Sequence, residues 1–532
     1  MEILLGKHEL RSLDPHWEEV YGAAGVRLRA VPRPEERVEP WEFSHTHSVM
    51  LGLRDDPPDV VIAHDFGAPA YSALRLRQAG LGFESTLFVV FCHGPRRYVI
   101  DLSPGLALGD LRAVLGVSVL EQAAVELADV VVSPSAFLLE WMRMQGWSVP
   151  EHARVIPYFT RAGATGEATG PITRASPDAL RRLTFFGRVD ERKGLKIFSD
   201  ALARLEPNLL ESIEVEFVGK TTRTWTRERV ERLLPASARI VFAGELDQSD
   251  ALDRLARPGT LVVMPSLQEN SPNAVYECLE REIPFIASNV GGVPELIATG
   301  DRPRVLFEPT AESLEAALRR VFSDGTVPAS ARPAFDADDS FERWREVVEL
   351  GVAPRTGPRH DDAEYVLVPG GKDALRKTLV SIQRATGADA VTCGVRLPDG
   401  GLRFFAGDVG GLAALANGYG TVALIRRDLL GDVRPSGEER DGAWPVLAQL
   451  ATSGASIFSV PLPLTDAVAT PGTVEDDPAA ALRAVQALER GLPDPARGAA
   501  RLAAGLAGER ATAAPRGRRL PERARRVLRG LF

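Results

Sequence analysis

The stretch TLVVMPSLQENSPNAVYECLEREIPFIASNVGG, residues 260–292, has the pattern that decides the fold. It begins with the apolar run TLVVM, continues with a predicted helix over residues 273–281, and then has the second apolar run PFIAS. A strand, a helix and a strand in this order form a βαβ unit. Strands that are apolar along their whole length are typical of a parallel sheet covered on both faces. The stretch therefore predicts an α/β domain with a doubly wound parallel sheet.

The same alternation extends toward the amino terminus and defines two domains. A second domain, residues 180–351, is predicted to have earlier strands at RLTFF, EVEFV and RIVFAG, with helices between them. A first domain, residues 1–165, has the runs PDVVIAHDF, TLFVVF, ADVVVS and HARVIPYF, again separated by helices. The linker, residues 161–179, is rich in Gly, Thr, Ala and Pro. Doubly wound sheets bind ligands outside the carboxyl ends of their strands, so we expect a site in the cleft between the domains.

The rest of the chain has a different character. Residues 360–465 have shorter apolar runs, among them EYVLV, ADAVTCGV and TVALI, and predict a third, smaller α/β unit. Residues 466–532 form a tail rich in Ala, Pro, Gly and Arg, a composition that favours loose packing.

The composition excludes several classes of protein. The 532 residues are 45% hydrophobic and 25% charged, which is ordinary for globular domains and unlike a disordered or coiled-coil chain. The formal net charge of −9 argues against nucleic acid as the main partner. The three cysteines are far apart, so neither a disulfide framework nor a thiolate zinc site is expected. No apolar run approaches the ~18 residues of a membrane span, and the sequence therefore predicts a cytoplasmic protein.

Two charged clusters follow predicted strands of the second domain, at the same edge of its sheet. Glu269 follows the strand TLVVM, and Glu277 lies one turn inside the next helix, which starts near Asn273. A helix start has unpaired N–H groups and suits phosphate or sugar oxygens, while carboxylates beside it can accept hydrogen bonds from sugar hydroxyls. Arg188 and Lys193, after the strand RLTFF, could grip a diphosphate. Each cluster alone is equally well explained by solvated charge, but their shared position predicts a binding site.

The runs FFGRVDERKG (185–194) and VMPSLQENSPNAVYECLEREIPFIASNVGGVPEL (263–296) resemble the carboxyl-terminal domain of family 4 retaining glycosyltransferases. The E-x7-E motif of that family is met by Glu269 and Glu277. The resemblance covers roughly residues 1–350 and implies the GT-B fold of two Rossmann-like domains. The first domain would then face the acceptor, and the second would bind the nucleotide-sugar donor.

The resemblance also implies roles for individual residues. Arg188 and Lys193 would neutralise the donor diphosphate, Glu269 would contact the donor sugar, and Glu277 would bind the ribose. His93, after the strand FVVF of the first domain, matches a family histidine that faces the donor, although a lone histidine beside glycine is often structural. Transfer would proceed with retention, through electrostatic stabilisation of the departing nucleoside diphosphate and without a metal ion or other cofactor. The other residues expected around the donor are Gly187, Gly219, Gly244, Ser271 and Asn273.

The opening of the chain departs from the family pattern. Members open with a strand, a glycine-rich loop and a helix, whereas residues 1–32 contain no Gly-Gly pair. Either Met1–Leu5 is the first strand with a reduced loop, or the chain begins at the second strand. The run GVRLRAVP, which resembles a later strand of such domains, favours the second interpretation.

Two further motifs concern metal binding. Asp336 and Asp338 fit the D-x-D metal motif, but they precede a predicted helix at 341–350, and we interpret them as helix-start acids. Residues 364–465 resemble, in degenerate form, the second half of family 2 glycosyltransferases of the GT-A fold. Where that family has an aspartate-rich metal motif, this chain has Pro369-Gly370-Gly371-Lys372-Asp373. Too few carboxylates remain for a divalent cation, so this unit is expected to be inactive in transfer.

Together these patterns predict a nucleotide-sugar-dependent glycosyltransferase of the hexosyltransferase type. We expect it to act in bacterial surface polysaccharide synthesis, on a glycan, lipid-linked or other acceptor. Two alternatives stay open: an inactive homologue that binds nucleotide sugar or acts as a scaffold, and a sugar-nucleotide epimerase. Arginines surround an apolar stripe in the tail, a pattern that fits either a solvated tail or a peripheral contact with the inner face of a membrane. The stripe consists of Leu520, Ala524, Val527, Leu528 and Leu531.

Overall fold

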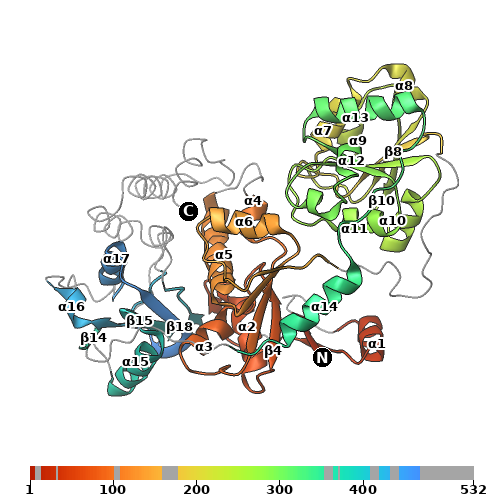
Figure 1. The fold of residues 1–532 in the computed structure, drawn as a ribbon. Coiled ribbons are helices and arrows are strands. Elements are labelled where there is room, and N and C mark those ends of the chain that lie inside the picture. The colour runs from red at the N-terminus through yellow and green to blue at the C-terminus, as the bar shows by residue number, and fades with distance from the viewer. Residues whose placement is uncertain are drawn as a thin grey trace, which may run out of the picture.

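The computed structural model of the chain describes residues 1–5, 13–31, 34–100, 108–158, 178–352, 363–368, 372–407, 418–431 and 443–467. These residues form three α/β units, and the first domain lies between the second domain and the C-terminal unit (Figure 1). The apolar stripe predicted between Leu520 and Leu531 lies outside the described residues. No helix in the described part of the chain is long and apolar enough to cross a membrane.

The second domain has one six-stranded parallel sheet in the order β10-β9-β8-β11-β12-β13. The strand order reverses between β8 and β11, so the crevice of this doubly wound sheet lies at the carboxyl ends of these two strands. The strands are β8 (Arg182–Phe186), β9 (Glu214–Val218), β10 (Arg239–Gly244), β11 (Thr260–Met264), β12 (Phe285–Ser288) and β13 (Leu306–Phe307). The helices are α7 (Leu195–Leu202), α8 (Pro207–Glu211), α9 (Arg227–Glu231), α10 (Gln248–Leu255), α11 (Asn273–Glu280), α12 (Arg302–Val305) and α13 (Ala311–Asp324), with a 3₁₀ turn at Val293–Leu296.

The first domain has a four-stranded parallel sheet, β4-β5-β6-β7, and a separate parallel pair, β1 and β2. β1 (Glu2–Leu5), α1 (Pro15–Ala23) and β2 (Arg27–Ala30) form a strand–helix–strand unit. The apolar run EILL of β1 pairs in register with RLRA of β2, so residues 2–5 do form a strand. Whether β1 corresponds to the first or the second strand of the family pattern stays a prediction. The other strands are β4 (Val60–His64), β5 (Leu87–Phe91), β6 (Val130–Ser133) and β7 (Arg154–Val155). The other helices are α2 (Glu42–Arg54), α3 (Tyr71–Gln78), α4 (Arg96–Ile100), α5 (Leu108–Leu127) and α6 (Ala136–Met144).

After the second domain, helix α14 (Ala337–Val348) returns to the first domain. Val347 is 1% exposed and packs with the buried face of β5 and β6, and the Trp344 ring lies 4.9 Å from that of Phe91. Arg343 Nη2 donates to the carbonyl oxygen of Val155 at 2.6 Å. The two domains are therefore joined by a packed helix as well as by the linker.

The C-terminal unit is a mixed sheet in the order β14-β17-β15-β16-β3, with β18 paired to β15. β3 (Val38–Glu39) belongs to the first domain, and it pairs with β16 of the C-terminal unit. The strands are β14 (Tyr365–Val368), β15 (Ala390–Arg396), β16 (Leu402–Arg403), β17 (Ala423–Arg426) and β18 (Ile457–Asp466). The helices are α15 (Asp373–Thr386), α16 (Arg427–Leu430) and α17 (Trp444–Thr452).

The C-terminal unit and the first domain share one hydrophobic core. Buried residues of α2, α3, α15 and α17 form a single cluster with those of β14, β15, β17 and β18. The Phe43 and Phe404 ring centroids lie 6.0 Å apart, and Tyr71 Oη donates to the carbonyl oxygen of Ala406 at 3.1 Å. The unit predicted over residues 360–465 is therefore completed by a strand and two helices of the first domain. Local periodicity does not encode pairing across such a distance in the sequence.

Candidate active site

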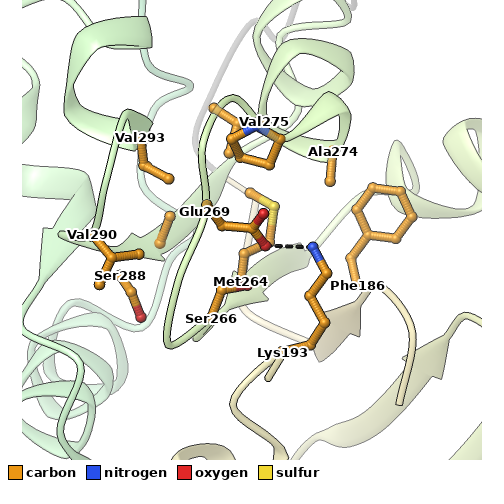
Figure 2. Close-up of a pocket in the computed structure, with 12 residues that line it drawn as sticks. Phe186, Lys193, Met264, Ser266, Glu269, Ala274, Val275, Ser288, Val290 and Val293 are labelled. Atoms are coloured by element: carbon orange, nitrogen blue, oxygen red, sulfur yellow. Dashed lines mark hydrogen bonds and ion pairs between the residues drawn. The ribbon is translucent and has the colours of Figure 1, made fainter. Parts of the chain in front are cut away.

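Lys193 and Glu269 meet at the crevice where the strand order of the second domain reverses (Figure 2). Lys193 lies in the turn after β8, and Glu269 lies in the loop after β11. Lys193 Nζ donates to Glu269 Oε1, and only 19% and 10% of the two side chains are exposed. Arg192 Nη1 lies 3.9 Å from the other carboxylate oxygen. The structure thus brings the two clusters found in the sequence into direct contact.

The turn after β8 is shaped by Asp190 and Gly194. The Asp190 carboxylate accepts hydrogen bonds from the backbone N–H of Lys193 at 2.9 Å and from Arg188 Nε at 2.6 Å. Gly194 has a φ of 77°, and a Cβ at this position would lie 1.7 Å from the carbonyl oxygen of Pro265. Only glycine permits this approach, so the turn that carries the lysine lies directly against the end of β11.

The loop that carries Glu269 is held by a pair of glycines after β12. A Cβ at Gly291, whose φ is 54°, would lie 1.7 Å from the carbonyl oxygen of Glu269. A Cβ at Gly292 would lie 2.0 Å from the carbonyl oxygen of Asn270. The Gly292 N–H also donates to the Glu269 carbonyl at 3.3 Å. The position of Glu269 is therefore set by close backbone contact, which any side chain at the two glycines would disrupt.

A pocket surrounds the ion pair (Figure 2). Its walls are mainly apolar and come from the ends of β8, β11 and β12 and from the start of α11. A lysine can bind phosphate and a carboxylate can accept from hydroxyls, so the pocket suits a ligand that carries both groups. The lining residues are Phe186, Lys193, Met264, Ser266, Glu269, Pro272, Ala274, Val275, Ala287, Ser288, Val290 and Val293.

Helix α11 begins at Asn273, where the sequence predicted it. Glu277, one turn further, is half-buried, and its Oε1 accepts from Gln248 Nε2 of α10 at 2.6 Å. Asn273 is exposed, whereas Ser271 is buried with its Oγ 2.8 Å from Tyr276 Oη. The two carboxylates of the E-x7-E motif therefore lie on either side of a helix start, and Glu269 but not Glu277 lines the pocket.

The remaining candidates of the second domain lie at the ends of β8, β9 and β10. Arg188 does not line the pocket, and 56% of its side chain is exposed. Gly187 lies beside the Lys193 side chain, since a Cβ there would be 3.7 Å from the lysine Cδ. Gly219 donates to the Gly244 carbonyl at 3.1 Å, and a Cβ at Gly244 would meet nothing within 4 Å. Space is thus open beside Gly244 at the end of β10, the edge strand that is separated from β8 by β9.

His93 lies after β5 of the first domain, at the contact between the domains. Its Nδ1 lies 2.7 Å from Tyr158 Oη. The buried Asp65 accepts from the backbone N–H groups of His93 at 2.9 Å and of Gly94 at 3.0 Å. Burial lowers the pKa of the His93 imidazole, although the nearby Asp65 carboxylate opposes this shift. Burial therefore favours the neutral form of the imidazole.

Asn270 is a site residue that the sequence analysis missed. It is 6% exposed, its Nδ2 donates to the carbonyl oxygen of His93 at 3.1 Å, and its Oδ1 accepts from Ser135 Oγ. This amide joins the Glu269 loop to the first domain. Its position directly after Glu269 was the available signal, but its partners lie 177 and 135 residues away in the sequence.

The described residues contain no group of three or more His, Cys, Asp or Glu side chains that could hold a metal ion. Asp336 is the N-cap of α14, and its side chain accepts from the Asp339 N–H at 2.9 Å. The interpretation of this D-x-D run as a helix start is confirmed. Of the run Pro369-Gly370-Gly371-Lys372-Asp373, the first three residues lie outside the described part of the chain.

Comparison with known proteins relates the chain to a family of enzymes. Among curated proteins, it is 22% identical over 319 residues to the sulfoquinovosyl transferase SQD2 of Arabidopsis thaliana, and the match covers 58% of each chain. It is 25% identical over 321 residues to TuaC of Bacillus subtilis (strain 168), a glycosyltransferase named for teichuronic acid biosynthesis, with 59% of this chain and 72% of TuaC covered. The chain thus spans somewhat more than half of the length of the Arabidopsis relative.

Two solved structures also match the chain. Sucrose-phosphate synthase of Thermosynechococcus elongatus is 18% identical, with a TM-score of 0.46 over 65% of this chain and 86% of that chain. HepE of Anabaena, solved in complex with UDP, is 18% identical, with a TM-score of 0.44 over 65% of this chain and 91% of that chain.

Two family models match, one on each α/β domain. The model described as "Glycosyl transferase 4-like domain" matches residues 7–158, and the model described as "Glycosyl transferases group 1" matches residues 181–324. The matched segments coincide with the two parallel sheets whose loops meet at Lys193, Glu269 and His93. Over residues 7–324 the chain therefore belongs to the group 1 glycosyltransferases, the family 4 enzymes that its sequence motifs resemble.

Proposed function

We propose that the chain is a retaining, hexosyltransferase-type enzyme that moves a sugar from a nucleotide-sugar donor to a glycan, lipid-linked or other acceptor. The observation that carries the proposal is the Lys193–Glu269 pair in a pocket at the point where the strand order reverses. Doubly wound sheets bind nucleotides at this point. The pair offers a cation for the phosphate and a carboxylate for the sugar hydroxyls within one pocket.

Lys193 and Arg188 stabilise the departing nucleoside diphosphate. The reaction breaks the bond between the anomeric carbon and the diphosphate oxygen and forms a bond from that carbon to the acceptor oxygen, whose proton passes to the departing diphosphate. Negative charge therefore develops on the leaving group in the transition state. A fixed cation in a partly buried site stabilises this charge because little reorganisation is needed during the reaction. Lys193 pairs with Glu269, and Arg188 pairs with Asp190. Donor binding replaces these partners with the diphosphate and leaves Glu269 to accept hydrogen bonds from the sugar.

The other candidates surround the nucleotide and the sugar. Glu277 binds the ribose from the first turns of α11. The base lies near Gly219 and Gly244, with open space beside Gly244 and the Gly187 backbone directly against Gly219. His93, whose neutral form is favoured by burial, faces the donor from the first domain and acts as a hydrogen-bonding partner rather than as a cation. Backbone groups of Gly187, Ser271 and Asn273 complete the donor site, which needs no metal ion.

The proposed setting is polysaccharide synthesis at the cytoplasmic side of a bacterial membrane. The similarity to TuaC, which is named for teichuronic acid biosynthesis, supports this setting. In this proposal the C-terminal unit is a GT-A-like remnant without transferase activity, and the basic tail makes a peripheral contact with the membrane.

A thermal-shift titration with UDP, GDP, ADP and their sugar conjugates tests the donor site. Binding to the folded state adds about 2.7 kcal/mol at a hundredfold excess of ligand over the dissociation constant. We expect stabilisation by one nucleotide and its loss in Lys193→Ala. Lys196→Ala is the matched control, because Lys196 is 72% exposed and pairs only with Asp200 on its own helix. If no nucleotide stabilises a cooperatively folding chain, the scaffold alternative replaces this proposal.

A further inference from the structure

Glu295 of the second domain caps a helix of the first domain. Its Oε2 accepts from the Ala136 N–H at 2.7 Å, and its Oε1 accepts from the Phe137 N–H at 2.9 Å. These two residues open α6, where backbone N–H groups have no partner within the helix. A carboxylate at this end also interacts favourably with the helix dipole. Glu295 therefore joins the domains through two charge-assisted hydrogen bonds.

Asn270 forms a second link beside the first. Ser135, the N-cap of α6, accepts from the Leu138 N–H at 3.2 Å and donates through its Oγ to Asn270 Oδ1. The Asn270 Nδ2 donates to the carbonyl oxygen of His93 at 3.1 Å. One buried amide therefore bonds to both the start of α6 and the segment that carries His93.

The backbone between the two links is packed too closely for either to move alone. A Cβ at Gly292 would lie 2.0 Å from the Asn270 carbonyl oxygen and 2.7 Å from Ser135 Cβ. A Cβ at Gly291 would lie 1.7 Å from the Glu269 carbonyl oxygen. The segment that leads to Glu295 therefore lies directly on the Glu269 loop, and the start of α6 lies against both.

We propose that Asn270 and Glu295 are positioning residues, which together hold the start of α6 and the His93 segment against the Glu269 loop. This clamp fixes Glu269 and His93 on opposite sides of one site. The inference rests on the proposed function, in which the donor nucleotide binds the second domain and the first domain faces the acceptor. The clamp therefore acts on transfer, which needs both domains, and leaves nucleotide affinity unchanged.

Hydrogen exchange of the full chain tests the clamp itself. In Glu295→Ala the N–H groups of Ala136 and Phe137 lose their acceptor, and we expect them to exchange at least tenfold faster. Exchange at Leu138, whose N–H is held by Ser135, should change less. Glu231→Ala is the matched control, because Glu231 lies on the surface of the same domain and pairs with Arg227 on its own helix. Unchanged exchange at both residues would overturn the clamp.

Steady-state kinetics test the positioning role. We expect kcat to fall at least tenfold in Glu295→Ala and in Asn270→Asp, which keeps the acceptor for Ser135 but loses the donor to His93. The nucleotide dissociation constant should stay within twofold of the wild-type value. Glu295→Gln keeps an acceptor oxygen and should recover part of the lost kcat, whereas Glu231→Ala should match the wild type.

The outcomes separate this inference from the proposed function. A wild-type chain that binds no nucleotide and transfers no sugar contradicts the proposed function, and the exchange measurement then still decides whether the clamp exists. A wild-type chain that transfers sugar, with an unchanged kcat in both Glu295→Ala and Asn270→Asp, overturns the positioning role. A parallel loss of kcat, nucleotide affinity and melting temperature in both variants also overturns it, because that pattern indicates structural damage only.

Discussion

The hydrophobic core of the second domain consists mainly of its own residues, whereas the first domain shares its core with the C-terminal unit. The buried residues of the two clusters in the second domain lie between Leu183 and Ala331, and Tyr158 of the first domain packs against the edge of one of them. The main cluster of the first domain combines residues from Val38 to Ala124 with residues from Tyr365 to Val460. The segments matched by the two family models, 7–158 and 181–324, are therefore not equally independent. The core of the second domain extends beyond its match to nearby residues such as Val327 and Ala331, whereas the core of the first domain depends on residues from Tyr365 onward.

The largest effect is expected from deleting residues 353–532. This deletion keeps both matched segments, but it removes residues that contact α2 and α3, such as Phe404 against Phe43 and Ala406 at Tyr71. We expect the first domain to lose its cooperative fold, because the apolar faces of α2 and α3 would be exposed to water. Hydrogen exchange should show unprotected amides in α3 and protected amides in α7. Equal protection of α3 in the deleted and full-length chains would show that the first domain folds without the C-terminal unit.

Two phenylalanine substitutions test which parts of the chain share a core. Phe404 of the C-terminal unit is 1% exposed and packs on Phe43 of the first domain, while Phe185 is fully buried within the second domain. Each change to alanine should cost about 3–5 kcal/mol. Phe404→Ala should lower protection in both the first domain and the C-terminal unit, and Phe185→Ala should lower it in the second domain alone. Loss of protection confined to the C-terminal unit in Phe404→Ala would contradict the shared core.

The sequence predicted the second domain closely because its elements are encoded locally. The apolar run of β11 and the helix that starts at Asn273 are where the pattern placed them. β3, in contrast, has only two residues and joins a sheet whose other strands come from beyond residue 364. No periodicity is detectable in so short a strand, and its partner lies far away in the sequence. Elements completed by long-range pairing are therefore the ones that sequence patterns do not predict.

The candidate site follows the same rule. Lys193 and Glu269 were predicted together because each directly follows a strand of one sheet, so topology alone brings them close. Asn270 and Glu295 were missed because their roles depend on contacts with the other domain. The spacing of motifs within one domain does not show which residues of the neighbouring domain contact that domain.

Loss of the central ion pair should affect activity more than stability. Lys193→Ala should lower kcat by about 10²–10³-fold, as expected for one fixed group that stabilises the leaving group. Glu269→Ala should abolish detectable transfer, because the sugar loses its carboxylate partner. Both variants should still unfold cooperatively, since neither residue belongs to a core cluster, but Lys193→Ala should lower the melting temperature more than Glu269→Ala because it leaves the buried Glu269 carboxylate without its main partner. Turnover equal to that of Lys196→Ala would contradict the site.

A change of pH should affect the stability of the two domains in opposite directions. Glu121 of the first domain is fully buried between two loops, with its oxygens accepting from the N–H groups of Gly67 and Arg96, each at 2.7 Å. Burial raises its pKa to about 8. Asp301 of the second domain is bonded to Arg332 at 3.0 Å, and this holds the pKa of its carboxyl well below the usual range.

These opposite shifts give opposite trends in stability. A glutamate in the unfolded chain has a pKa of about 4.3. Between that pH and pH 8, the folded first domain binds more protons at Glu121 than the unfolded chain does. Its free energy of unfolding therefore falls as pH rises, by at most about 1.4 kcal/mol per pH unit. The contribution of Asp301 is present above its unfolded pKa and is lost as pH falls through the lower folded value. Domain-resolved hydrogen exchange from pH 5 to 8 measures the first trend, and Glu121→Gln should remove it. A first domain whose stability rises over this range would contradict the assignment.

The smallest effect is expected where the two domains are joined, at Asp336. Its carboxylate caps α14 by accepting from the Asp339 N–H at 2.9 Å, and Asp336→Ala should cost about 1 kcal/mol. Since α14 packs on the first domain through Trp344 and Val347, the loss should appear as roughly fivefold faster exchange in α14, with α3 and α7 unchanged. Asp336→Asn keeps an acceptor oxygen and should retain most of the protection. If the loss of protection spreads into the second domain, α14 belongs to the cooperative unit of that domain. The second domain would then not be independent of the helix that joins it to the first domain.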